Sequence, residues 1–386
     1  MPTFFEFFAG GGMARAGLGK TWRCAFSNEF DVKKSIIYRQ NWTGPKAPDV
    51  LKVADVGTLT TDDLPGQPDL TWASFPCQDL SLAGAGAGLK GDRSGTFWPF
   101  WRLMQGMVKA GRAPKVIVLE NVCGMLTSHD GKDFAAICSA LAGSNYYYGA
   151  VVVDAVHFVP QSRPRLFVIG VHEDLAFNAS AVTGEGGTDL WHSRGLLAAY
   201  DKLPAKAKEK WLWWTMPKPS RKSVTFAELV EDDPVGVSWH TDDETTKLLG
   251  MMSALHLKKL EAAKATGERT VGAIYKRTRR DEFGRKVQRA EVRFDDLAGG
   301  VRTPAGGSSR QVIIVVEGNK IRSRLISPRE TARLMGLPDS YKLPSNYNEA
   351  YHLTGDGVAV PVVRHLAKHI FEPLLSNWAE GSRGVA

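Results

Sequence analysis

The stretch FPCQDLS at residues 75–81 decides how this chain is interpreted, because it puts a cysteine directly after a strand-like run. Proline fixes its own backbone φ and biases the residue before it toward extended geometry. Cys77 is therefore expected at the exit of a strand, where open α/β sheets place their chemistry. Most free cysteines are inert buried residues, so a nucleophile needs support from other segments.

The amino terminus supplies the first support. Residues 4–13 read FFEFFAGGGM, an aromatic run that ends in three glycines before a helix-like pattern. This order predicts a strand, a tight turn and a helix start, a geometry that lets the backbone approach a ligand closely. The full dinucleotide-binding fingerprint is absent, so the turn alone does not identify a nucleotide site.

Two acidic positions follow strand-like runs. Glu29 and Phe30 come after the apolar residues 24–26, and Asp55 and Val56 come after a second short run. A carboxylate at the end of the second strand can accept hydrogen bonds from ribose hydroxyls, and Asp55 is placed to accept one from an adenine amino group. Each acid taken singly also fits a solvated loop.

Two further segments carry charged residues at strand ends. Residues 116–122, VIVLENV, predict a buried parallel strand that carries Glu120 near its end. Arg163 and Arg165 stand just before another buried run at 166–170. Cys77, Glu120 and these arginines form one site if the strand ends lie together.

The order of these segments resembles one family, the DNA (cytosine-5) methyltransferases. Six motifs of the family are matched in its order by residues 8–12, 76–78, 120–122, 161–165, 328–338 and 355–360. The resemblance implies an α/β fold: an S-adenosylmethionine-dependent methyltransferase (Rossmann-like) sheet domain with an inserted smaller target-recognition domain. We expect the catalytic and cofactor-binding domain at 1–173, the recognition domain at 174–320 and a returning C-terminal part at 321–386.

The implied reaction explains the catalytic residue types. The Cys77 thiolate adds to carbon 6 of cytosine, and carbon 5 then attacks the sulfonium methyl group of S-adenosylmethionine. Glu120 protonates or hydrogen-bonds ring nitrogen 3. Arg165 holds the exocyclic oxygen and lowers the pKa of Cys77, while Arg163 orients the thiol or a phosphate. The base must leave the duplex to be reached.

The resemblance also implies a cofactor pocket without a metal. Three residues depart from the family pattern there, because Glu6 replaces an aspartate, Met13 a glycine and Asp356 an asparagine. The expected cofactor-binding residues are Phe8, Gly10, Gly11, Gly12, Met13, Glu29, Phe30, Asp55, Val56, Pro76, Phe97, Asp356, Gly357 and Val358.

DNA contacts are expected from three segments. The glycine-rich stretch 82–95 is suited to close over an extruded base, and a basic stretch at 269–293 holds nine basic residues against three acids. Its pattern predicts a hairpin that turns near Gly284, although a solvated charged surface is the alternative. The expected DNA-contacting residues are Ser81, Lys90, Arg93, Arg277, Arg279, Arg280, Ser308, Ser309 and Arg310.

Composition is consistent with this interpretation. The formal net charge of +8 over 386 residues suits a polyanionic partner, and the four cysteines have no metal-binding spacing. No signal peptide and no apolar run of transmembrane length is recognised. We expect a cytoplasmic, nucleoid-associated protein of bacterial or phage type that acts on double-stranded DNA as a monomer, with a cognate restriction endonuclease left open.

Three alternatives stay open at this stage. The same chemistry acts on RNA in a branch of the family, although that branch has a shorter insertion than 174–320. A non-catalytic DNA-binding relative would keep the fold, but the intact set of Cys77, Glu120 and Arg165 argues against it. A nucleotide-dependent oxidoreductase would use the glycine turn and leave the Pro-Cys-Gln motif without a role.

Overall fold

The structure, a computed structural model, describes residues 1–45, 47–76, 96–175, 177–187, 190–220, 224–302 and 310–381. The chain divides into two compact units. The first unit comprises Met1–Asp154, Pro164–Pro219 and Val360–Ala386, and the second comprises Ala155–Arg163 and Ser220–Ala359. These limits are not the domain boundaries that the sequence led us to expect near residues 173 and 320.

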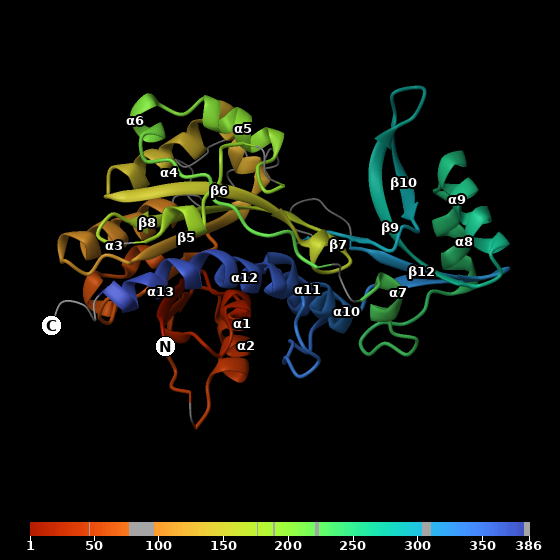
Figure 1. The fold of residues 1–386 in the computed structure, drawn as a ribbon. Coiled ribbons are helices and arrows are strands. Elements are labelled where there is room, and N and C mark those ends of the chain that lie inside the picture. The colour runs from red at the N-terminus through yellow and green to blue at the C-terminus, as the bar shows by residue number, and fades with distance from the viewer. Residues whose placement is uncertain are drawn as a thin grey trace. The chain divides into compact units, whose positions relative to one another are not determined.

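A seven-stranded sheet forms the centre of the first unit (Figure 1). Its strand order is β3-β2-β1-β4-β5-β8-β6, and β8 runs antiparallel to both of its neighbours while the other pairs are parallel. The strands are β1 (Thr3–Phe7), β2 (Arg23–Glu29), β3 (Leu51–Val53), β4 (Leu70–Ala73), β5 (Val116–Val122), β6 (Tyr146–Asp154) and β8 (Pro164–His172). The strand order reverses between β1 and β4, and open α/β sheets bind ligands outside the carboxyl ends of such strands.

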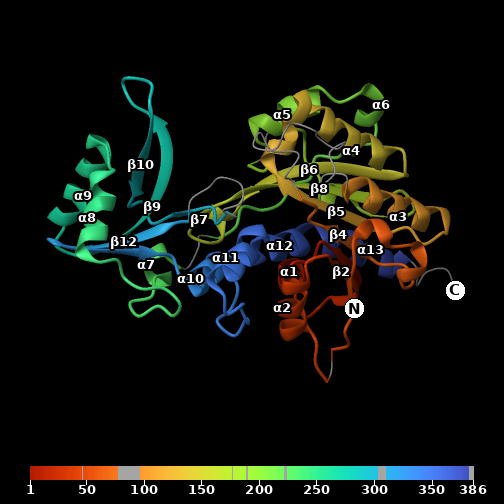
Figure 2. The same ribbon diagram turned by 180° about the vertical axis from the view of Figure 1, so that it is seen from behind.

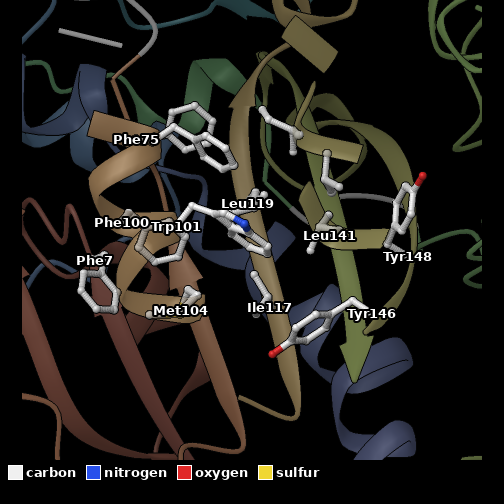
Figure 3. Packing of buried hydrophobic residues seen from close by; sticks show 14 of the residues in the cluster. Phe7, Phe75, Phe100, Trp101, Met104, Ile117, Leu119, Leu141, Tyr146 and Tyr148 are labelled. Atoms are coloured by element: carbon white, nitrogen blue, oxygen red, sulfur yellow. The ribbon is translucent and has the colours of Figure 1, made fainter. Parts of the chain in front are cut away.

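Helices cover both faces of this sheet, because successive side chains of a buried strand point to opposite faces. Ala73 packs in one hydrophobic cluster with Phe100 and Phe134, while its neighbour Trp72 meets Phe371 with ring centroids 6.4 Å apart (Figure 3). The helices of the unit are α1 (Met13–Leu18), α2 (Val32–Trp42), α3 (Phe97–Lys109), α4 (Lys132–Ala142), α5 (Arg194–Asp201), α6 (Ala205–Lys208), α12 (Val360–Leu366) and α13 (Glu372–Gly381).

The tryptophan-rich stretch after β8 packs on the first unit, which explains part of the shifted boundary. Trp214 is fully buried and its Nε1 donates to the carbonyl of Ile169 in β8 at 3.1 Å. Trp211 lies against Tyr148 of β6, with ring centroids 5.6 Å apart. We had expected these aromatic residues in the core of a separate small domain.

The second unit is built on a four-stranded antiparallel sheet of order β10-β9-β12-β13 (Figure 2). Ile274 of β9 packs with Leu248 and Leu260 of α8 and α9, whereas its neighbour Ala273 packs with residues of α7, α10 and α11. The elements are β9 (Arg269–Arg280), β10 (Lys286–Arg293), β12 (Val312–Glu317), β13 (Lys320–Leu325), α7 (Phe226–Leu229), α8 (Asp242–Gly250), α9 (Ala254–Ala265), α10 (Pro328–Leu334) and α11 (Tyr347–Asp356), with a small sheet of β7 (Gln161–Ser162) and β11 (Ala298–Gly299).

The predicted basic hairpin is confirmed. Strands β9 and β10 pair from Lys286 opposite Arg280 to Arg293 opposite Ala273. Gly284 in the turn has φ +76°, a left-handed conformation that favours glycine. Among the described residues, no helix is both long and apolar enough to cross a membrane.

Candidate active site and cofactor turn

The carboxyl ends of three adjacent strands bring the catalytic motifs together in the first unit. Phe7 of β1 pairs with Ala73 of β4, and Ala73 pairs with Leu119 of β5. The residues that follow therefore leave the sheet side by side at one edge. This places the glycine turn, the segment before the Pro-Cys-Gln motif and Glu120 next to one another.

A side-chain hydrogen bond fixes the segment that leads to the cysteine. Asn121 donates from Nδ2 to the carbonyl of Phe75 at 3.2 Å, and Phe75 packs against Phe97 with centroids 5.4 Å apart. Pro76, which is exposed, is the last described residue before Cys77. Cys77, Ser81, Lys90, Arg93, Ser308 and Ser309 lie outside the described residues.

Glu120 and Arg165 form an ion pair at this edge. The Arg165 Nε lies 3.2 Å from the Glu120 Oε1, and the two side chains are 19% and 8% exposed. Arg165 stands opposite Val122 in the antiparallel β5–β8 pair, so two strands hold the ion pair from either side. A nearly buried carboxyl group next to a single guanidinium is suited to exchange a proton or a hydrogen bond with a substrate.

Arg163 has different partners from those expected. It belongs to the second unit, where its guanidinium donates to the carbonyls of Val301, Gly355 and Gly357. These carbonyls, and neither a thiol nor a phosphate, engage its two Nη groups in this structure. Arg163 thereby fixes the backbone on both sides of Asp356.

The predicted glycine turn has the backbone geometry that a close ligand approach requires. Phe8, Gly10 and Gly12 have φ values of +56°, +55° and +77°. A Cβ atom on Gly12 would lie 2.3 Å from Nε1 of Trp42, so this position accepts only glycine. Trp42 also donates from Nε1 to the carbonyl of Gly11 at 2.8 Å, which holds the turn from the side of α2.

Glu29 links the glycine turn to the end of β2. Its Oε2 accepts from the Gly10 backbone N–H at 2.7 Å and its Oε1 from the Asp31 N–H at 2.8 Å. Two amides use about half of the acceptor sites of a carboxylate, which leaves capacity for hydroxyl groups. The next residue, Phe30, exposes 71% of its surface.

Asp55 and Val56 follow β3, the neighbour of β2 at the edge of the sheet. Asp55 is exposed and accepts from the Gly57 N–H at 2.7 Å, while Val56 is buried. The three predicted cofactor segments therefore end neighbouring strands. Met13 and Phe97 differ from this set because both side chains are buried in the core, at 2% and 0% exposure.

Glu6, the first departure from the family pattern, is buried beneath the glycine turn. Its Oε1 accepts from the Arg15 backbone N–H at 3.2 Å, and its Oε2 lies 3.5 Å from the Tyr38 hydroxyl. Burial raises the pKa of Glu6 to about 7, against the opposing effect of Arg15. Burial also raises the pKa of the neighbouring Cys24 thiol to about 12.

The remaining predicted residues lie in the second unit. Asp356 is exposed at the end of α11, Gly357 follows it, and Val358 is buried. Arg310 donates to Asn348 and lies over the Tyr347 ring, 5.5 Å from its centroid. Arg277, Arg279 and Arg280 are exposed on the hairpin. Within the described part of the chain, no three His, Cys, Asp or Glu side chains gather as metal ligands would.

Sequence reasoning missed three residues that shape these sites. Trp42 is 31 residues from Gly11 and Asn121 is 46 residues from Phe75, so no local pattern relates either pair. Glu291, which contacts Arg277 and Arg279, was a detectable exception. Folding the sequence about Gly284 puts these three residues on one face of the hairpin.

Comparisons with known proteins agree with this geometry. A sequence model of the family described as C-5 cytosine-specific DNA methylase matches residues 2–372. The Type II methyltransferase M.HpaII of Haemophilus parainfluenzae is 25% identical over 96% of this chain and 90% of its own length. M.BsuFI of Bacillus subtilis is 26% identical over 97% and 73%. The solved Entamoeba histolytica methyltransferase EhMeth shares the fold, with a TM-score of 0.64 at 13% identity over 97% of this chain and 99% of its own.

Proposed function

This chain belongs to the family of C-5 cytosine-specific DNA methylases, and we propose that it methylates carbon 5 of cytosine in a specific double-stranded DNA sequence through a covalent Cys77 adduct. It is a DNA (cytosine-5-)-methyltransferase with a mixed α/β fold. The observation that carries the proposal is the sheet edge at which the Glu120–Arg165 pair stands beside the anchored Phe75–Pro76 segment.

S-adenosylmethionine fits the residues at the carboxyl ends of β1, β2 and β3. When bound, it supplies an electrophilic methyl group. We propose that the positive-φ turn at Gly10–Gly12 lets the backbone lie against it and that Glu29 accepts from its ribose hydroxyls. The exposed Phe30 ring provides a surface for an adenine base, and Asp55 an acceptor for its amino group.

The catalytic roles follow from charge and position. The Cys77 thiolate adds to carbon 6 of the flipped-out cytosine, which makes carbon 5 nucleophilic. Glu120 hydrogen-bonds ring nitrogen 3 where electron density accumulates. Arg165 orients Glu120 through its Nε and directs positive charge at the exocyclic oxygen. Elimination of the thiol after loss of the carbon-5 proton releases the methylated base.

DNA recognition is assigned to the inserted region. We propose that the region 174–320 reads the target, chiefly through the basic hairpin of β9 and β10. Asp356, Gly357 and Val358 are proposed to complete the cofactor pocket, with Arg163 fixing their backbone. A companion restriction endonuclease, action as a monomer and association with the nucleoid remain predictions.

Transfer of tritiated methyl groups tests the proposal. The native protein should label duplex DNA and leave RNA unlabelled, whereas Cys77→Ala should abolish labelling and keep binding of DNA and of the demethylated cofactor. Duplex DNA with 5-fluorocytosine at the target should trap the native enzyme in a denaturant-stable adduct, because no proton can leave carbon 5. Labelling of RNA alone would refute the substrate, and an adduct with Cys77→Ala would refute the nucleophile.

A further inference from the structure

The two faces of the basic hairpin carry different chemistry. Side chains alternate between faces along each strand, so the register assigns every residue of β9 and β10 to one of them. The carboxylate-bearing face holds Arg277, Arg279, Arg289 and Glu291. The acid-free face holds Lys276, Arg280 and Lys286, and neither strand places an acidic residue on it.

On the carboxylate-bearing face, one glutamate engages two arginines through the same atom type. Glu291 accepts from the Arg279 Nε at 2.6 Å, and its other oxygen lies 3.4 Å from the Arg277 Nε. The hydrogen bond from Arg279 is the main cause that lowers the pKa of Glu291, with Arg277 adding its charge, so the group stays ionised. The Glu291 side chain is 20% exposed, whereas both arginine side chains expose more than half of their surface.

This contact leaves a defined part of each guanidinium turned outward. A bond through Nε uses the side of the group and leaves the end pair of Nη atoms as a planar fork. Such a fork matches two acceptors side by side, and the O6 and N7 atoms of guanine form that pair in the major groove. Holding the guanidinium in place beforehand also reduces the rotamer freedom lost on binding.

A phosphate-binding role does not explain Glu291. A carboxylate in contact with both arginines repels a phosphate placed on the same guanidinium groups. Base edges carry no full negative charge, and a carboxylate can even accept from the amino group of cytosine. A two-stranded antiparallel ribbon is one of the elements that the major groove admits.

We propose that Glu291 holds Arg277 and Arg279 as two guanine-reading forks, which makes these three residues determinants of the target sequence. This inference rests on the proposed function and names how the same enzyme selects its site. Residues two apart on a strand are about 6.6–6.8 Å apart, which is about two base-pair steps. The recognised site therefore contains two guanines about two steps apart.

Arg279 and Arg280 give a matched pair for the test, since they are adjacent in sequence and lie on opposite faces. A duplex library randomised around a central cytosine is methylated by each variant and read by bisulfite sequencing, which gives the base preference at every position. For Arg279→Lys, which keeps the charge and removes the fork, we expect the guanine preference at one position to fall about fivefold or more. Arg277→Lys should do the same at the second position, whereas Arg280→Lys should change no position.

Glu291→Gln separates the proposal from a simple salt bridge. With one negative charge removed, binding to a duplex without the site should tighten, while the preference at both guanine positions falls about threefold or more. Kd values for duplexes with and without each guanine give the same answer for a variant that turns over slowly. An unchanged preference profile in Arg279→Lys and Glu291→Gln, or an equal loss at every position, overturns this inference. Native protein that methylates no DNA, or methylates every cytosine equally, overturns the proposed function instead.

Discussion

The buried carboxyl group of Glu6 should make the stability of the first unit depend on pH. Its pKa rises from an ordinary value of 4.5 to about 7, because the side chain is only 1% exposed and burial disfavours its charged form. The folded protein therefore holds this proton more tightly than the unfolded chain does. The stability that Glu6 contributes is complete below pH 4.5 and is lost as the pH rises through 7.

The size of the effect follows from the same shift. One pKa unit corresponds to about 1.4 kcal/mol, so ionising Glu6 between pH 5 and pH 8 costs on the order of 2–3 kcal/mol of folding free energy. Glu6→Gln keeps the shape and an oxygen acceptor for the Arg15 N–H, but it does not titrate. The difference in stability between Glu6→Gln and the native protein should thus grow by about 2–3 kcal/mol over this interval.

Thermal unfolding of both proteins at pH 5.0, 6.5 and 8.0 measures that difference. For a unit of this size, about 2–3 kcal/mol corresponds to a shift of roughly 5–10 °C in Tm. Glu282→Gln, in the exposed turn of the hairpin, is the control and should follow the native protein at each pH. A stability difference between Glu6→Gln and the native protein that stays constant from pH 5 to pH 8 would refute the reasoning.

Three further predictions concern ligands. Trp42→Phe removes the donor to the Gly11 carbonyl and should raise the Kd of the demethylated cofactor roughly 3- to 10-fold; calorimetry that finds an unchanged Kd would contradict a role for this bond. Reversing Arg279 and Arg280 to Glu should weaken DNA binding and flatten its dependence on salt by about one counterion for each lost phosphate contact, with cofactor affinity unchanged. An unaltered slope would make the hairpin a solvated surface. Asp356→Asn should tighten the demethylated product relative to S-adenosylmethionine, because the carboxylate attracts the sulfonium and repels the ligand's own carboxylate; equal shifts for both ligands in calorimetry would place Asp356 away from that end.

Local pattern was enough for the elements that carry the chemistry. The aromatic run before Gly10 forms β1, the run that holds Glu120 forms β5, and the basic stretch turns at Gly284. Each of these depends on residues within about ten positions of one another, such as a glycine at positive φ or a run of aliphatic side chains. The motif order also identified the family, since six short motifs retain their succession along the chain.

Tertiary structure decided which distant groups meet. The sequence did not reveal that Asn121 holds the Phe75 carbonyl, that Arg163 spends its donors on Gly355 and Gly357, or that Trp214 packs on β8. Many donors and apolar side chains in the chain could satisfy such contacts equally well. Only the folded backbone selects among them, because hydrogen bonds and close packing act over a few ångströms and are indifferent to separation along the sequence.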